Sequence, residues 1–153
     1  MIKYYFLIVF FSFTNSVCTQ SIYNEKKIRA ILYNQYNMNE EFPEITSIHF
    51  YNNKKGRVLQ IEFETVFAEF EIIERIMNSL AKVGQYSKTP LNNFIVINHY
   101  KDSDIPISYE SNADCAINYF IKDQITKRSW MKDCLSYSIT EETQNMSELN
   151  LRD

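Results

Sequence analysis

The stretch from Glu44 to Glu64 reads EITSIHFYNNKKGRVLQIEFE and decides the fold. Apolar and polar residues alternate on both sides of the run Asn52 to Gly56, which is typical of two half-buried strands. The run itself can turn through a left-handed glycine and close a β-hairpin. The sequence therefore predicts two antiparallel strands, at 44–51 and at 57–64.

The alternation in this hairpin separates an apolar face from a polar one. In the second strand Leu59, Ile61 and Phe63 point inward, which requires their neighbours to point away from the core. The opposite face, which a single layer of helices would leave open, carries His49, Tyr51, Gln60 and Glu62. We take Tyr51, Gln60 and Glu62 as candidate binding residues on this face.

The rest of the chain alternates between helical and strand patterns. Apolar residues at helical spacing predict one helix over 25–36 and another that begins at an N-cap Thr65 and ends near Gly84. The run 94–97 fits a strand covered on both faces, and Pro106 would confine the next strand to a sheet edge. A hairpin across 101–104 would join these two strands. A capping box at 111–114 starts a third helix, whose apolar period runs to Ile125.

These elements predict a two-layer α+β sandwich, with a four-stranded, mainly antiparallel sheet and about three helices on one face. We expect a single domain over 20–140 and a polar, frayed tail over 141–153. The chain of 153 residues contains only two glycines, which argues against an all-β barrel. It also excludes a Gly-rich phosphate loop or a dinucleotide fingerprint.

The first residues have the order of a secretory signal peptide. A lone positive charge at Lys3 precedes an apolar run, Tyr4 to Phe13, and a small polar segment follows. The run is about half the length that a membrane span needs. We therefore expect a cleaved leader at 1–19, no membrane span, and a secreted or periplasmic protein. A minority alternative makes Cys18 the lipid-bearing residue of a bacterial lipoprotein, which would anchor the chain.

Cys115 and Cys134 are the two cysteines that remain if cleavage follows Cys18, and an oxidising compartment favours a disulfide between them. One continuous helix would place them about 28 Å apart, whereas a disulfide needs Cα atoms within roughly 7 Å. The bond therefore predicts a chain reversal, which we place near 126–129, where the apolar period lapses.

Charge argues against several partner classes. The formal net charge is −3, and the lysines and arginines form no block. A mildly acidic surface is a poor match for nucleic acid or anionic lipid. The 11 tyrosines suit a protein-recognition surface, although an AT-rich genome would raise Tyr, Asn, Ile and Lys together.

Catalytic signals are weak. His49 and His99 are the only histidines, and His99 is the first residue of the densest polar cluster of the chain, which includes Asp102 and Asp104. Such a group could form a metal or acid/base site, but aspartates beside a serine in a hairpin loop are more often turn formers. A cysteine nucleophile paired with a histidine conflicts with the expected disulfide. We predict no metal and no cofactor.

Two function classes follow. The favoured one is a small exported protein-interaction module, such as an inhibitor, an immunity-type factor or an accessory factor, that binds another protein through the open sheet face and is not an enzyme. The alternative is a small exported hydrolase or metal-dependent enzyme centred on His99 with Asp102 and Asp104.

Overall fold

The computed structural model describes residues 22–40, 42–66, 70–101 and 103–139. The predicted leader, 1–19, and the predicted tail, 141–153, lie outside these residues. The described chain forms four helices and five strands. In chain order they are α1 (Glu25–Asn37), β1 (Ile45–Asn53), β2 (Gly56–Thr65), α2 (Phe70–Gly84), β3 (Asn93–Tyr100), β4 (Ser103–Asn112), α3 (Ala113–Phe120), α4 (Lys127–Asp133) and β5 (Leu135–Ile139).

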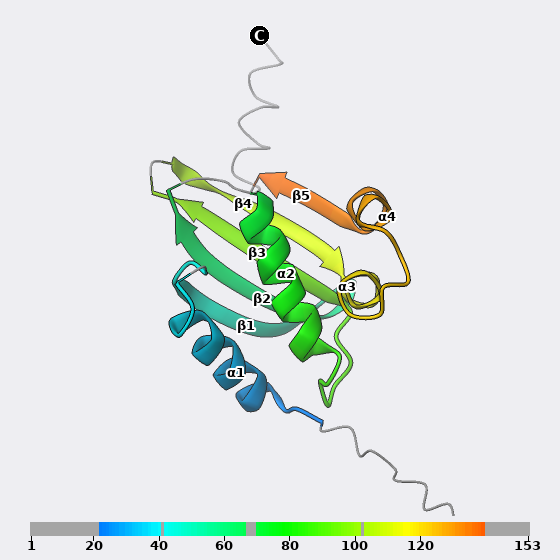
Figure 1. Cartoon of the computed structure of the whole chain (residues 1–153). Coiled ribbons are helices and arrows are strands. Elements are labelled where there is room, and N and C mark those ends of the chain that lie inside the picture. Colours follow the sequence, from blue (N-terminus) through cyan, green and yellow to red (C-terminus); the bar gives the residue numbers. More distant parts are fainter. Residues whose placement is uncertain (1–21, 41, 67–69, 102, 140–153) are drawn as a thin grey trace, which may run out of the picture.

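The five strands form one mixed sheet in the order β1-β2-β3-β4-β5 (Figure 1). Neighbouring strands are antiparallel, except that β2 and β3 run parallel. The prediction of an α+β fold is confirmed, but four strands was one too few. The parallel pair arises because α2 carries the chain back to the end of the sheet where β2 began.

The helices pack on one face of the sheet, as predicted (Figure 1). Their buried side chains meet alternate residues of the strands, and the core includes Ile28 of α1, Leu80 of α2, Ala116 of α3 and Trp130 of α4. Within the described residues, no helix combines the length and the apolar content that crossing a membrane requires.

The predicted hairpin is confirmed, with His49 opposite Gln60 and Asn53 opposite Gly56. Gly56 has a φ of 110°, a conformation that favours glycine. A Cβ at this position would lie 2.3 Å from Asn92 Oδ1, the atom that accepts a hydrogen bond from the backbone N–H of Arg57. Glycine therefore provides both the turn and the close approach of the loop before β3.

The predicted start of the second helix was wrong. Thr65 is the last residue of β2, not a helix cap, and its hydroxyl donates to Asn98 Oδ1 of β3 at 3.0 Å. α2 begins only at Phe70, whereas its end at Gly84 agrees with the prediction. A side chain on Gly84 would meet the ring of Phe94, so this glycine lets the helix end lie directly on the sheet.

Two predictions about the middle strands also need correction. β4 is an interior strand, because β5 pairs with it from Ile107 to Ser111. Pro106 lies just beyond these described pairs, so its missing N–H leaves the ladder intact. β3 is buried on the helix side through Phe94 and Val96, whereas Ile95 and Ile97 on its other side are only half-buried.

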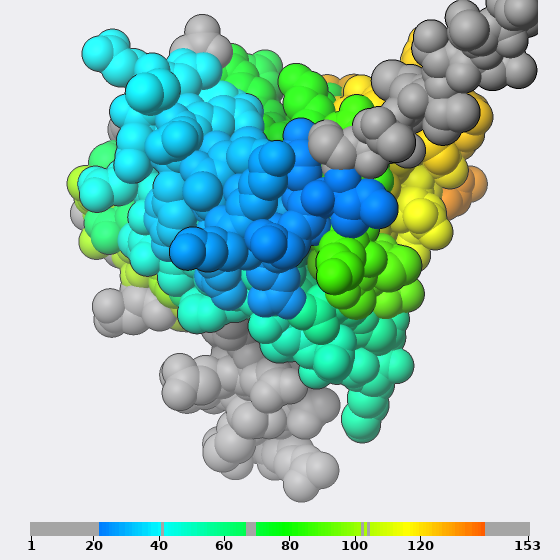
Figure 2. All heavy atoms as spheres, turned by 90° about the horizontal axis from the view of Figure 1, so that it is seen from below, coloured from blue at the N-terminus to red at the C-terminus, as the bar shows by residue number. Residues whose placement is uncertain are grey.

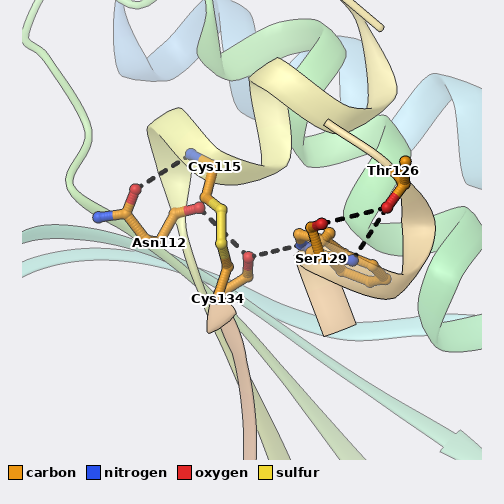
Figure 3. The surroundings of a disulfide bond; sticks show 7 residues. Asn112, Cys115, Thr126, Ser129 and Cys134 are labelled. Atoms are coloured by element: carbon orange, nitrogen blue, oxygen red, sulfur yellow. Dashed lines mark hydrogen bonds between the residues drawn. A yellow bond between two sulfur atoms is a disulfide. The ribbon is translucent and has the colours of Figure 1, made fainter. Parts of the chain in front are cut away.

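The chain between Asn112 and Cys134 folds into a corner closed by a disulfide (Figure 3). Asn112, rather than Ser111, caps α3, and its side chain accepts the backbone N–H of Cys115 at 3.1 Å. The helix ends at Phe120, and Asp123 with a φ of 53° turns the chain. The reversal thus precedes 126–129, where Thr126 caps α4.

The Cys115–Cys134 disulfide agrees with the prediction, with the two Cα atoms 6.1 Å apart. The backbone N–H of Asn112 donates to the Cys134 carbonyl at 3.3 Å beside the bond. The disulfide therefore ties the start of α3 to the junction of α4 and β5.

The beginning of the described chain lies against the loop that follows α2. The backbone N–H of Tyr23 donates to the Tyr86 carbonyl at 2.6 Å, and the N–H of Lys88 donates to the Tyr23 carbonyl at 2.7 Å. Figure 2 shows this contact, with the first described residues in blue beside the loop in bright green. The bridge fixes the start of α1 at the edge of the helix layer.

Candidate functional site

The face of the sheet opposite the helices, the open face, carries the predicted binding residues. Because Leu59 and Ile61 point into the core, the alternate residues Gln60 and Glu62 of β2 point to the open face. Tyr51 lies beside them on β1. The structure therefore places all three predicted binding residues, together with His49, on one surface.

Hydrogen bonds link these side chains in a chain that crosses three strands. The Tyr51 hydroxyl donates to Gln60 Oε1 at 2.7 Å, and Gln60 Nε2 donates to Glu62 Oε1 at 2.8 Å. On the other side, His99 Nε2 of β3 lies 3.1 Å from Glu62 Oε2. Each link limits the freedom of the next, so the open face presents its polar groups in a fixed arrangement.

Glu62 lies between the two histidines. His49 Nε2 is 3.7 Å from Glu62 Oε1, and His99 approaches the other carboxylate oxygen. The register explains this arrangement, because His49 lies opposite Gln60 and His99 lies opposite Glu64, two positions on either side of Glu62. In the described segments, no three His, Cys, Asp or Glu side chains form a group that could hold a metal ion.

The environment of Glu62 favours its ionised form. Partial burial, the largest single influence, opposes ionisation, but hydrogen bonds with His99 and Gln60 outweigh it and lower the pKa of Glu62 below its ordinary value. The carboxylate is therefore charged at neutral pH. It presents a partly shielded negative charge, with its side chain 24% exposed.

A second polar contact reaches the fourth strand. Lys55 of the hairpin turn donates to Glu110 Oε2 of β4 at 2.9 Å. Burial raises the pKa of Tyr51, and the charges of Glu110 and Glu62 add to this effect. The Tyr51 hydroxyl therefore stays protonated at neutral pH and acts as a hydrogen-bond donor.

The centre of the open face is apolar. Ile95 lies between Gln60 and Glu110 in the register, and Ile97 lies between Glu62 and Ser108. Both isoleucines are half-buried. Sequence reasoning missed them because an unbroken apolar run resembles a strand covered on both sides. Because all four residues of the run 94–97 are apolar, the sequence does not show which side of the strand faces away from the core.

The predicted cluster of His99 with Asp102 and Asp104 lies largely outside the described side chains. Asp102 lies outside them, and for Asp104 the structure describes only the backbone, within β4. Among the described side chains, His99 is paired with Glu62. This partner could not be read from the chain, because it depends on the parallel register of β2 and β3.

A polar cleft also exists on the helix side, between α2 and α3. Its lining residues are Glu71, Glu74, Arg75, Asn78, Tyr119 and Phe120. Glu74 accepts hydrogen bonds from the Tyr119 hydroxyl at 3.0 Å and from Lys127 Nζ at 2.5 Å. These contacts join α2 to the α3–α4 corner, so the carboxylate has a structural partner on each side.

In comparisons with protein-family models, with curated proteins and with solved structures, nothing matched this chain.

Proposed function

We propose that this chain is an exported protein-interaction module that binds another protein through the open face of its sheet. The observation that supports this proposal most is the apolar centre of that face, formed by Ile95 and Ile97 inside a polar surround. Protein interfaces commonly have such an apolar centre with a polar rim. A sheet surface that none of the described helices covers suits a macromolecular partner better than a small molecule, which binds in concave pockets.

Tyr51 is the residue from which we expect the largest contribution to binding. Tyrosine offers a large amphipathic contact area with few rotatable bonds, and it is enriched among residues that dominate interface energies. The bond from its hydroxyl to Gln60 holds the ring in place before a partner arrives. Preorganisation of this kind reduces the entropy lost on binding.

Two features support export to the cell exterior or the periplasm. The first is the signal-peptide pattern at 1–19. The second is the Cys115–Cys134 disulfide, because such bonds persist in oxidising compartments. Intact-mass analysis of the exported protein would find a start between Val17 and Ser21, whereas an added lipid mass on Cys18 would establish the anchored form.

Site-specific photo-cross-linking tests the proposed binding face. A photoreactive phenylalanine derivative replaces Tyr51 in one variant and Tyr33 of α1 in another, and each is produced in the cells that express the protein. Both tyrosines are 37% exposed, so the two positions are matched in accessibility. We expect one discrete protein adduct from position 51 and none from position 33.

Mass spectrometry of the adduct identifies the cross-linked partner. The same adduct from both positions would contradict the open face as the binding surface. An absence of protein adducts at both positions would contradict the interaction module itself.

A further inference from the structure

β5 lies at one edge of the sheet. Among the described residues, no strand pairs with its outer side. Its sequence, Leu135-Ser136-Tyr137-Ser138-Ile139, has no charged residue and no proline. Edge strands of soluble proteins usually carry lysine, proline or a bulge that prevents pairing with another strand. The sequence of β5 has none of these features, so its outer side can pair with another strand.

The hydrogen-bond pattern shows which backbone groups are available on this edge. The Asn112 N–H donates to the Cys134 carbonyl, so residues 112 and 134 form a hydrogen-bonded pair. Such pairs alternate along an antiparallel ladder, and the register therefore also makes 110–136 and 108–138 hydrogen-bonded pairs. The backbone groups of Leu135, Tyr137 and Ile139 consequently point to the outer edge.

The side chains of the same three residues form an apolar surface. Tyr137 is 75% exposed and Ile139 is 44% exposed. This surface continues into an apolar pocket of about 400 Å³, which is lined by Phe70, Ile107, Tyr109, Met131, Leu135 and Tyr137. A strand added to β5 would thus gain apolar contacts as well as backbone hydrogen bonds.

We propose that the occupant of this edge is β5 of a second copy, paired antiparallel about a two-fold axis at Tyr137. The sequence is nearly symmetric about this residue. The pairing places Leu135 opposite Ile139 of the other copy and Ser136 opposite Ser138, while Tyr137 meets its own counterpart. No charge meets a like charge, so the edge is self-complementary, as a two-fold interface requires.

The outward groups of Leu135, Tyr137 and Ile139 fit this symmetry. With Tyr137 on the axis, each of the three pairs across the interface is a hydrogen-bonded pair, giving about six backbone hydrogen bonds. The two sheets become one continuous sheet. Because the axis is perpendicular to that sheet, both open faces lie on the same side, and the dimer contact covers neither of them. The dimer is independent of the proposed partner binding but would make it bivalent.

Sedimentation equilibrium of the exported protein over a range of concentrations tests the dimer. We expect the wild-type mass to approach twice that of the monomer. Tyr137→Lys introduces the charge that protects natural edge strands and should raise the dissociation constant of the dimer at least about tenfold. Tyr33→Lys on α1 adds the same charge elsewhere and should leave it unchanged. A wild-type monomer at all concentrations, or equal effects of the two variants, would overturn the proposal.

Cysteine cross-linking tests the register and does not depend on the folding of the lysine variant. Tyr137→Cys places two thiols at a hydrogen-bonded pair, with Cα atoms about 5.5 Å apart, a separation that a disulfide can span. Mild oxidation should convert most of this variant into a covalent dimer. Ser136→Cys is the matched control. In the proposed register its thiol lies opposite Ser138 of the other copy and therefore has no second thiol with which to form a disulfide. Equal cross-linking of the two variants, or none in Tyr137→Cys, would contradict the two-fold pairing.

Discussion

At the scale of single residues, Glu62 is the group that joins the polar side chains of the open face. It accepts from Gln60 on its own strand and lies beside one histidine from each neighbouring strand. The charge of Glu62 is only partly exposed to water, so these neighbours supply the stabilisation that full hydration would otherwise provide. Removal of the charge should therefore affect both the stability of the domain and the arrangement of its open face.

The stability contribution of Glu62 should depend on pH. Its pKa in the folded chain lies below the ordinary value, so its contribution is present above about pH 4.3 and disappears as the pH falls through the lower folded-state pKa. Glu62→Gln should lower the free energy of unfolding by about 1 kcal/mol at pH 7. This difference should shrink towards zero as the pH falls below about 4.

Urea unfolding of the wild type and Glu62→Gln at several pH values measures this effect. Glu64→Gln is the control, because its exposed carboxylate lies 4.0 Å from Nζ of Lys101, in the turn after β3, and should contribute little. A constant difference between wild type and Glu62→Gln from pH 7 to pH 3 would show that the charge is not the cause.

Trp130 is the largest fully buried side chain and anchors α4 in the core. Its ring stacks on Tyr119 at a centroid distance of 5.2 Å, and its Nε1–H donates to the Ser111 hydroxyl at 3.0 Å. Trp130→Ala should lower the free energy of unfolding by about 3–5 kcal/mol. Denaturant unfolding followed by far-ultraviolet circular dichroism measures the loss. Trp130→Phe should lose less, and a loss below about 1 kcal/mol in the alanine variant would contradict the central position of this ring.

At the scale of elements, the α3–α4 corner is held by one covalent and several non-covalent contacts. α3 and α4 are short, and isolated helices of this length are unstable in water. Their side chains Tyr119 and Lys127 both reach Glu74 of α2, and the disulfide closes the corner beside β5. Tertiary contacts, rather than local helix preference, therefore stabilise this part of the chain.

Loss of the disulfide should weaken the whole domain. The bond spans a sequence separation of 19 residues, for which the chain-entropy model gives a stabilisation of about 3 kcal/mol. The double variant Cys115→Ser/Cys134→Ser should therefore unfold at a lower denaturant concentration. Wild-type protein kept in a reductant should show the same shift. An unchanged unfolding midpoint in both samples would contradict a stabilising role for the bond.

The elements that the sequence predicted well are those specified by local patterns. The hairpin and α1 each follow a clear period, and turn or cap residues flank them. β5 was missed because it is only five residues long and becomes a strand through pairing with β4. The same non-local pairing makes β4 an interior strand despite Pro106, and the crossing of α2 makes β2 and β3 parallel.

The open face, too, was predictable only where local sequence patterns specify it. Alternation within the hairpin placed Tyr51, Gln60 and Glu62 on one surface, and this depended on local sequence alone. The approach of His99 to Glu62 and the central position of Ile95 and Ile97 depend on the register between β2 and β3. Those residues are more than thirty positions apart in the chain, so no short pattern could have paired them.

At the scale of the whole molecule, the two faces of the sheet differ in what covers them. One face is sealed by four helices around a single apolar core. The other has an apolar centre at Ile95 and Ile97, with Tyr51, Glu62 and Glu110 around it. The buried apolar contacts are therefore concentrated on one side, and no described helix covers the other side, which is the proposed binding surface. The edge at β5 is a separate surface, so a dimer formed there leaves both open faces accessible.

The measurement that tests the role of the open face most directly is the dissociation constant of the partner identified by cross-linking, determined by calorimetry for two alanine variants. Tyr51→Ala and Tyr33→Ala remove equally exposed rings, one from the open face and one from α1. We predict that Tyr51→Ala raises the dissociation constant at least about tenfold, whereas Tyr33→Ala changes it less than about twofold. Equal effects of the two variants, or a larger effect of Tyr33→Ala, would contradict binding through the open face.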